Sequence, residues 1–464
     1  SFSVKGTVVS AGDNEPLIGV TILQEGTTNG VVTDFDGNFT IEVKGASKAT
    51  LVISYIGMVT QKHSVNAQTK TLNVALASDT KVMDEVVVVA YGVRKKGTIA
   101  GSVSSVKSEK IENVPAASFD QALQGQSTGL QVISASGEPS KAATFQIRGT
   151  NSINSGKSPL FILDGVPISS SDFNTLSPND IESISVLKDA SSTSIYGARA
   201  ANGVIVITSK RGLAMDKAKV TLRAQYGFSQ LAQTNWKMMN TAERIQFEKE
   251  VGLDAGKDYN LLSRVNVNWL DEVFNDAAPL QNYELSINRA TDRLNYYVSG
   301  GFYDQDGIAQ NSTFRRYNMR ANADVKASNW LKIGTSTMAA YEEIQQTEEG
   351  SMALYTPISG SRFMLPYWNP YNKDGSLASE NNGTWAGIGQ NPIEWMANNP
   401  VHYKKYKVLS TVFANITPIK NLTIRTQFGA DYSHSTAFMQ SYPSYVINNG
   451  MGSAGRNSSD VLTL

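Results

Sequence analysis

The chain of 464 residues contains no cysteine and only three histidines, His63, His402 and His434, which lie far apart in the sequence. Without cysteine there is no disulfide framework, no thiolate metal ligand and no cysteine nucleophile. Three scattered histidines also leave almost no material for a histidine metal site or a catalytic triad. The sequence therefore predicts no catalytic residue, no metal site, no cofactor and no enzymatic activity.

An excess of either charge is also missing, since 41 Lys and Arg residues balance 41 Asp and Glu residues. Proteins that bind nucleic acid usually carry a basic surface, so we expect no nucleic-acid partner. Long apolar runs are missing too: none exceeds about seven residues, whereas a helix that spans a membrane needs about 20. The strands of a membrane β-barrel alternate apolar and polar residues, so that class stays open.

Residues 1–78 predict a small β-sandwich, because short strand-like stretches recur about every 8–12 residues between turn signals. These stretches are Val4–Val9, Gly19–Gln24, Gly30–Thr33, Asn38–Val43, Thr50–Tyr55 and Thr71–Leu76. The carboxylates in Asp34–Asn38 could belong to a calcium loop. The segment lacks the Glu that closes an EF-hand loop, so we interpret it as a hairpin turn.

Residues 79–96 hold a strongly extended segment, which consists of Asp84, Glu85, Val86, Val87, Val88, Val89, Ala90 and Tyr91. Four consecutive valines favour a strand. Two interpretations remain open at this point. The segment is either a buried strand of a neighbouring domain, or a mobile strand that pairs with the sheet edge of a partner through backbone hydrogen bonds.

Residues 97–212 mix strand and helix patterns and predict a compact α+β domain. The expected strands are Thr98–Val106, Leu130–Ile133, Phe145–Thr150, Pro159–Pro167, Ile184–Lys188 and Gly203–Ser209, with short helices at Ser118–Leu123 and Ser191–Tyr196. The glycines of this region do not form a phosphate loop, because Gly197–Gly203 lacks the Lys and Ser/Thr that end such a loop.

Residues 213–464 alternate strictly between apolar and polar side chains in seven segments. They are Val220–Ser229, Tyr283–Arg289, Leu294–Phe302, Tyr317–Lys326, Leu331–Tyr341, Val408–Ile416 and Leu422–Tyr432. An antiparallel sheet in a soluble protein would also alternate. Strands of about ten residues, however, have the length that a tilted strand needs to cross a bilayer.

The connections between these segments favour the membrane barrel. Short connections at 290–293, 327–330 and 417–421 alternate with longer ones at 230–281, 305–314, 342–405 and 433–454. Outer-membrane barrels show this alternation, with the short turns facing the periplasm. Aromatic residues at the long-loop ends predict an interfacial belt. The polar face must line a wet lumen or meet a plug, because it carries Arg223, Arg320, Asp324, Arg425 and Asp431.

These features resemble the SusC-like TonB-dependent outer-membrane transporters of Bacteroidota. The resemblance is carried by Met83–Gly92, Arg148–Thr150, Leu163–Pro167, Asp180–Ile184, Val186–Ala190 and Ile195–Ile205. It implies that Asp84–Tyr91 is a TonB box, that residues 97–212 are a plug domain, and that residues 1–78 are a carboxypeptidase-regulatory-like domain. It also implies a barrel of about 22 strands. Only about seven or eight strands fit in residues 213–464, so we expect the chain to be the N-terminal part of a longer protein.

The resemblance implies active import of a large nutrient, foremost an oligosaccharide or glycan, across the outer membrane. TonB would supply the energy, the N-terminal domains would face the periplasm, and a SusD-like surface lipoprotein would act as a lid. Two transporter–lipoprotein pairs would form a dimer. Oligopeptide import and a non-transporting receptor or adhesin are the alternatives. A hydrolase would need acid and base side chains that converge on one site. Asp304 and Asp306 could form such a pair, but we interpret the Asp-Gln-Asp-Gly segment that contains them as a loop.

The candidates for contact with the substrate are aromatic residues of the 342–405 loop: Trp368, Trp385, Trp395, Tyr367 and Tyr371. Amide and carboxylate side chains lie between them in the sequence. Flat aromatic faces beside such polar groups suit sugar rings, which present both C–H patches and hydroxyl groups. Two other roles remain open for these residues, namely packing within a large loop and contact with the lid protein.

Overall fold

The computed structural model describes residues 1–11, 15–44, 47–55, 58, 60–76, 86–89, 92–95, 103–111, 123–133, 137–139, 141, 143–149, 156–173, 175–215, 217–232, 237–347, 356–441, 443 and 452–463. The chain forms two compact units. One consists of Ser1–Val87 and Val93–Thr98, the other of Val88–Gly92 and Ile99–Leu464.

The first unit is the expected β-sandwich. Its strands are β1 (Phe2–Ser10), β2 (Thr21–Gln24), β3 (Gly30–Val32), β4 (Asn38–Val43), β5 (Lys48–Ser54), β6 (Gln61–Asn66) and β7 (Val74–Leu76). They form one sheet in the order β4-β1-β7 and a second in the order β3-β2-β5-β6. Alternate residues of the strands, among them Val4, Ile41 and Ile53, are buried together between the two sheets. Burial of this single apolar core stabilises the sandwich.

Two details of the sandwich bear on the sequence predictions. Strand β6 was not predicted, because Gln61–Asn66 contains only one buried apolar residue, Val65. The Asp34–Asn38 segment is a turn: the Asp34 carboxylate accepts hydrogen bonds from the backbone N–H groups of Asp36 at 3.0 Å and Asn38 at 2.8 Å. The Asp34 carboxylate, which a calcium loop would use as a ligand, thus accepts backbone hydrogen bonds of the turn instead.

The segment that follows the sandwich forms a two-stranded sheet, which pairs β8 (Val86–Val89) with β9 (Gly92–Lys95). The extended conformation expected from the four valines is therefore present. Asp84, Glu85, Ala90 and Tyr91 lie outside the described residues.

The α+β domain of the second unit has a five-stranded sheet in the order β10-β15-β16-β13-β14 and a hairpin of β11 and β12. Its strands are β10 (Val103–Lys107), β11 (Leu130–Ile133), β12 (Thr144–Ile147), β13 (Leu160–Leu163), β14 (Val166–Ile168), β15 (Ile181–Leu187) and β16 (Val204–Ser209). The helical segments are η2 (Ser108–Lys110), α2 (Ser170–Phe173), η3 (Pro178–Asp180), α3 (Ala190–Thr193), η4 (Ser194–Tyr196) and η5 (Ala198–Ala200). All but Leu123 of the predicted helix Ser118–Leu123 lie outside the described residues.

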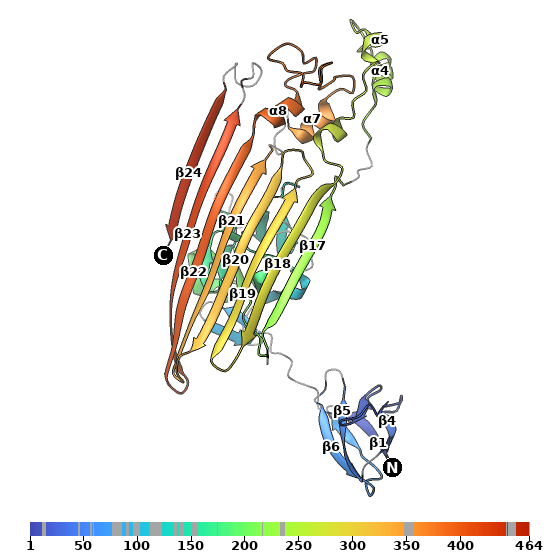
Figure 1. Ribbon diagram of the computed structural model, residues 1–464, viewed down its shortest axis with the longest axis vertical. Coiled ribbons are helices and arrows are strands. Elements are labelled where there is room, and N and C mark those ends of the chain that lie inside the picture. The colour runs from blue at the N-terminus through green and yellow to red at the C-terminus, as the bar shows by residue number, and fades with distance from the viewer. Residues whose placement is uncertain are drawn as a thin grey trace. The chain divides into compact units, whose positions relative to one another are not determined.

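Three phenylalanines hold the core of this domain. The rings of Phe145, Phe161 and Phe173 lie 4.8–5.3 Å apart, centroid to centroid, and two of the three pairs meet edge to face. The same core includes Met338 and Leu409, which belong to the large sheet described next. The α+β domain therefore packs directly on that sheet, as Figure 1 shows.

Residues 219–463 form one antiparallel sheet of eight strands in sequence order. The strands are β17 (Lys219–Ser229), β18 (Ala278–Ala290), β19 (Leu294–Asp306), β20 (Thr313–Lys326), β21 (Leu331–Gln346), β22 (Val401–Ile419), β23 (Leu422–Ser441) and β24 (Ser453–Thr463). All seven predicted segments are strands, and β24 is the eighth. This sheet agrees with the predicted class, which is mainly β with the first strands of a large antiparallel barrel.

The connections alternate in length as predicted. Short turns join β18 to β19, β20 to β21 and β22 to β23, while the other connections are longer. Five helices lie in the two longest loops: α4 (Thr241–Glu250), α5 (Tyr259–Leu262), α6 (Trp269–Val273), α7 (Pro357–Phe363) and α8 (Pro392–Asn398). Figure 1 shows them gathered at one end of the sheet. Among the described residues, no helix is long and apolar enough to cross a membrane.

An aromatic row crosses the outward face of the sheet near the long-loop end. It consists of Tyr283, Phe302, Tyr317, Tyr341 and Tyr406, which stand directly opposite one another on five neighbouring strands. Their ring centroids are 4.6–6.5 Å apart. Such a row is typical of the boundary between the hydrocarbon layer and the lipid headgroups.

The outward face of β20 provides a test of the membrane placement. Ala321 lies midway between Tyr317 of the aromatic row and Lys326 at the short-turn end, and its side chain points outward. We expect Ala321→Arg to destabilise the full-length protein by about 2–4 kcal/mol, because it places a cation against the middle of the bilayer. Val325→Arg, on the same face but next to Lys326, should cost under about 1 kcal/mol. Equal losses in urea titrations of both variants in lipid vesicles would contradict the membrane placement.

Candidate functional site

The inward face of the large sheet carries charged residues that contact the α+β domain. Arg320 of β20 is 2% exposed and lies between two aspartates of that domain. Its NH1 atom is 3.7 Å from Asp164 Oδ2, and its Nε atom is 3.8 Å from Asp180 Oδ2. One buried cation of the sheet thus faces two buried carboxylates of the domain that it holds.

Asp164 is fixed by a tight turn between β13 and β14. Asp164 and the following Gly165 both have positive φ, at 49° and 90°, and turn the chain sharply. The Asp164 carboxylate accepts hydrogen bonds from Ser209 N at 3.0 Å, Ser209 Oγ at 2.6 Å and Ser336 Oγ at 2.8 Å. Burial opposes ionisation of Asp164, but the Arg320 and Arg211 guanidinium groups and the Ser209 hydrogen bonds outweigh it and lower the pKa of the carboxyl.

Asp180 ends the short helical turn η3, which begins at Pro178. Its carboxylate accepts hydrogen bonds from Tyr297 OH at 3.1 Å and from Ser299 Oγ, both on β19. The neighbouring Asn179 accepts one from Arg223 NH1 of β17 at 2.7 Å. Side chains of β17, β19 and β20 therefore hold Asn179 and Asp180, at the start of the Asp180–Ile184 motif.

A second set of contacts lies where the chain passes from the α+β domain into the sheet. Asn322 Nδ2 donates hydrogen bonds to Ser209 Oγ at 2.9 Å and to Lys210 O at 2.7 Å. Arg211 NH1 donates to Asp324 Oδ1 at 3.0 Å. At Gly212 a Cβ atom would lie 2.1 Å from the Arg289 carbonyl oxygen, so only glycine fits at this close approach.

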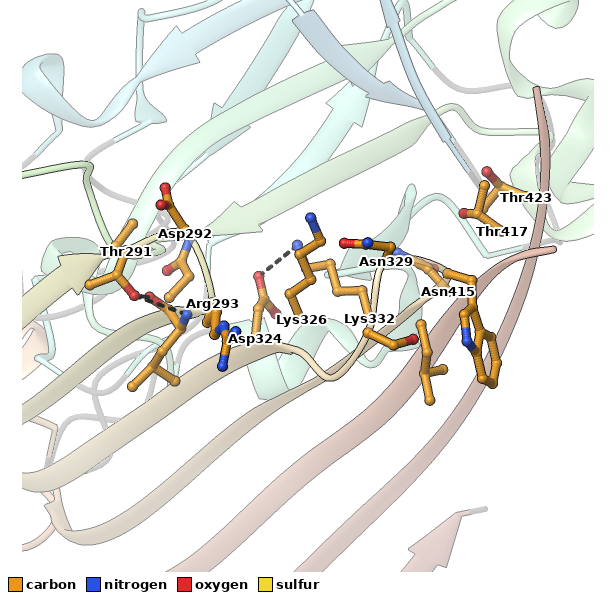
Figure 2. Close-up of a pocket in the computed structure, with 16 residues that line it drawn as sticks. Thr291, Asp292, Arg293, Asp324, Lys326, Asn329, Lys332, Asn415, Thr417 and Thr423 are labelled. Atoms are coloured by element: carbon orange, nitrogen blue, oxygen red, sulfur yellow. Dashed lines mark hydrogen bonds and ion pairs between the residues drawn. The ribbon is translucent and has the colours of Figure 1, made fainter. Parts of the chain in front are cut away.

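Next to this passage lies a cavity of about 460 Å³ at the short-turn end of the sheet. Asp324, Lys326 and Lys332 project into it, and Lys332 Nζ is 3.2 Å from Asp324 Oδ2 (Figure 2). Asp324 is therefore shared between Arg211 of the α+β domain and Lys332 of the large sheet. None of the residues predicted to contact substrate lines this cavity.

The five charged residues that the sequence placed on the polar face do lie on the inward face. Arg223, Arg320 and Asp324 contact the α+β domain, as described above. Asp431 pairs with Lys407, whose Nζ is also 2.7 Å from Asp172 Oδ1 of the domain, and Arg425 stacks over Phe413 at 4.3 Å from the ring centroid. Sequence alternation could place these residues on a face, but it carried no signal for the partners of Arg223, Arg320 and Asp324 in the α+β domain, which lie 44–156 positions away.

The aromatic candidates for substrate contact differ in exposure. Tyr367 and Trp385 are buried. Trp385 belongs to a hydrophobic cluster of the long loops, in which its ring meets that of Trp269 edge to face with the centroids 6.0 Å apart. Trp368 packs against this cluster. Trp395 is half-buried. Tyr371 is 39% exposed, and its hydroxyl donates to Glu272 Oε2 at 2.9 Å. Tyr371 is therefore exposed, Trp368 and Trp395 are half-buried, and Tyr367 and Trp385 are buried.

A buried glutamate, Glu248 of α4, joins the two longest loops. Its carboxylate accepts hydrogen bonds from Arg244 Nε at 2.8 Å, Lys257 Nζ at 2.8 Å, Tyr259 OH at 3.1 Å and Tyr367 OH at 2.8 Å. Tyr367 belongs to the 347–400 loop and the other three donors to the 230–277 loop. Burial opposes ionisation of Glu248, but these hydrogen bonds outweigh it and lower its pKa from the ordinary 4.5 to about 2. We call these five residues the Glu248 clasp.

Glu248→Ala should release the two loops from each other. We expect a local loss of about 1–3 kcal/mol, because four donors lose their common buried acceptor. Hydrogen exchange of residues 237–277 in the full-length protein would measure it. Glu250→Ala, two positions away and exposed, is the control and should change protection by less than about 0.5 kcal/mol. Equal effects of both substitutions would contradict the clasp.

The acid dependence of the clasp follows from the lowered pKa. Because the folded pKa of Glu248 lies below its unfolded value, the stabilisation is fully present above about pH 4.5. It is lost as the pH falls from there towards 2. Protection of the loops should therefore be constant at neutral pH and should decrease only in this acidic window.

Among the described residues, no group of three or more His, Asp or Glu side chains gathers closely enough to hold a metal ion.

Two regions of the chain match known families. Residues 95–204 match the family TonB-dependent Receptor Plug Domain, and residues 4–88 match the CarboxypepD_reg-like domain. A TonB-dependent receptor of Formosa agariphila is 34% identical over 93% of this chain and 43% of its own length. The TonB-dependent receptor SusC of Bacteroides thetaiotaomicron is 36% identical over 69% of this chain and 32% of its own length.

Among solved structures, the RagAB peptide importer in its open-open state matches with a TM-score of 0.70. The two sequences are 31% identical, and the match covers 82% of this chain and 46% of the importer's chain. The family consists of receptors and transporters, not enzymes, and its members are outer-membrane β-barrel proteins. The α+β domain is therefore a plug, and the eight-stranded sheet is part of a barrel wall. The chain belongs to the SusC-like TonB-dependent receptors, and it spans less than half the length of the relatives that it matches.

Proposed function

We propose that the full-length protein imports a large nutrient across the outer membrane and that TonB supplies the energy. The observation that carries this proposal is the polar contact between plug and wall. Arg320, Asn322 and Lys407 of the wall bind plug residues through hydrogen bonds and ion pairs. A polar interface of this kind closes the lumen at rest and can exchange its partners for water when the plug is pulled.

The Asp84–Tyr91 segment is the TonB box of this proposal. An extended segment can add a strand to the edge of a partner's sheet, and backbone hydrogen bonds then supply the affinity. Val86–Val89 already forms a strand, β8. With the short turns facing the periplasm, residues 1–78 and the TonB box lie on the periplasmic side, where TonB can reach them.

A SusD-like surface lipoprotein is the proposed lid. The 230–277 loop exposes large apolar side chains, among them Phe247, Val251 and Leu261, on and beside α4 and α5. Exposed apolar residues that cluster on one loop are typical of a protein interface. The Glu248 clasp holds this loop against its neighbour, which makes the surface rigid enough to dock a partner. Two such transporter–lipoprotein pairs would form the dimer.

An oligosaccharide or glycan is the proposed cargo. The exposed Tyr371 and the half-buried Trp395 offer aromatic faces beside amide side chains, which suits sugar rings. Trp368 is half-buried as well, and its ring packs edge to face against those of the buried Tyr367 and Trp385. A second candidate is an oligopeptide, because the RagAB importer, whose name states a peptide cargo, is 31% identical and has the same fold.

The test combines binding and uptake. Isothermal titration of the purified full-length protein, with its lid lipoprotein, against oligosaccharides and oligopeptides of matched size identifies the cargo class. Uptake of the labelled ligand into cells with and without a proton gradient then tests active transport. Binding of a ligand without gradient-dependent uptake would contradict import and would favour a non-transporting receptor or adhesin.

A further inference from the structure

A second row of side chains crosses the outward face of the sheet beside the aromatic row. It consists of Asp304, Arg315, Glu343 and Lys404, which stand directly opposite one another on β19 to β22. Each lies two residues from a member of the aromatic row on its own strand, so both rows share the outward face. We call these four residues the charged row.

The depth of the charged row follows from the strand geometry. Below the aromatic row, β20 presents Met319, Ala321, Ala323 and Val325 outward, which is an apolar surface suited to lipid chains. The charged row lies on the opposite side of the aromatic row, towards the long loops. Two residues of a tilted strand rise by about 5 Å. The charged row therefore lies at the level of the lipid headgroups, just outside the hydrocarbon layer.

The two cations of the row are its more exposed members. The side chains of Arg315 and Lys404 are 45% and 59% exposed, against 20% for Asp304 and 37% for Glu343. The ion pairs within the row are long: Arg315 Nε lies 3.3 Å from Asp304, Arg315 NH1 lies 3.7 Å from Glu343, and Lys404 Nζ lies 3.6 Å from Glu343. A guanidinium has five N–H donors and an ammonium has three, so each cation has donors beyond those that these ion pairs use.

The charged row also borders a cavity of about 330 Å³, which is lined in addition by Asp306, Thr313, Ile344, Gln345, His402 and Tyr403. Thr313, Gln345 and His402 can donate hydrogen bonds to an anion held by the cations, whereas an ionised Asp306 would repel it. An ion-pair ladder that served only to join the strands would need no such recess beside it.

We propose that the charged row binds the phosphate of a lipid headgroup at the long-loop surface of the membrane. Arg315 and Lys404 bind the phosphate oxygens in competition with Asp304 and Glu343, their partners on the sheet. This site would fix the height of the barrel in the membrane next to the proposed lid. The proposal rests on the membrane placement of the sheet and does not depend on the cargo or on transport.

The test is native mass spectrometry of the full-length protein with phosphatidylglycerol and with diacylglycerol of the same acyl chains, which lacks the phosphate. We expect phosphatidylglycerol to bind more tightly. Arg315→Gln and Lys404→Gln should each reduce this preference about fivefold. Lys373→Gln, which removes an exposed cation of the 347–400 loop, is the matched control and should leave the preference unchanged.

Asp304→Asn separates lipid binding from a merely structural role. If phosphate and Asp304 compete for Arg315, this substitution should increase the preference for phosphatidylglycerol. In a structural ladder, loss of either partner would weaken the sheet alike and would leave lipid preference unchanged. Equal binding of the two lipids, or a preference that none of these substitutions alters, would overturn the proposal. Competition by inorganic phosphate at millimolar concentration, without any preference between the lipids, would reassign the site to a free anion and overturn it as well.

Discussion

Deletion of Asp84–Tyr91 is expected to abolish uptake of the nutrient while the barrel still folds and binds its cargo at the cell surface. The apolar core of the sandwich ends at Leu76 and that of the plug begins at Val106, so neither core draws on this segment. The deletion therefore removes a partner strand for TonB but no buried contact of either described core. Uptake of labelled cargo by cells, measured beside surface binding in the same cells, gives both readouts.

Two variants control for the deletion. Replacement of the eight residues by a Gly/Ser linker of the same length keeps the spacing, and it should abolish uptake as well, because Gly and Ser disfavour a strand. Removal of residues 1–78 should reduce uptake only in part, since the sandwich folds around its own core. Normal uptake in the deletion variant would show that TonB binds elsewhere on the chain.

The periodicity of the sequence predicted the wall well, and it failed at the long-loop ends for a physical reason. The predicted segment Val408–Ile416 is the middle of a 19-residue strand, Val401–Ile419. Near the long loops the inward face becomes apolar, because Leu280, Tyr303, Phe314 and Ile344 form a buried cluster there with Tyr403 packed against it. The outward face at the same level carries Asp304, Arg315, Glu343 and Lys404. The apolar side of the alternation therefore changes faces within these strands, and a single strict pattern ends before the strand does.

The plug contacts could not be predicted in the same way. The motifs that contain Asp164 and Asp180 stand out in the sequence, but their partners Ser336 and Tyr297 lie more than 100 positions away. Pairing of this kind depends on which wall strand faces which plug turn, and no local pattern encodes that. The Glu248 clasp could not be predicted for the same reason. Glu248 and Tyr367 lie in separate loops, 119 positions apart, and no local sequence pattern marks either of them as buried.

Replacement of Arg320 by alanine is expected to destabilise the plug–wall interface by about 3–5 kcal/mol. The reason is that Asp164 and Asp180 would remain buried without the cation that lies between them. Ser209, Tyr297 and Ser299 could still donate hydrogen bonds, but they carry no charge to offset two carboxylates. Thermal unfolding of the full-length protein, together with protease release of plug fragments, would measure the loss.

The design of this experiment separates charge from packing. Arg315→Ala on the same strand is the matched control, because Arg315 points outward, is half exposed and should contribute less than about 1 kcal/mol through its ion pairs. Adding Asp164→Asn and Asp180→Asn to Arg320→Ala removes the unpaired charges and should recover part of the loss, since the amides can keep several of the hydrogen bonds. A plug that loosens in Arg320→Ala should also let large antibiotics enter cells, and the triple variant should reduce this leak. If Arg320→Ala and Arg315→Ala unfold at the same temperature and leak alike, the buried ion pairs do not hold the plug, and neutral contacts such as those of Asn322 must do so instead.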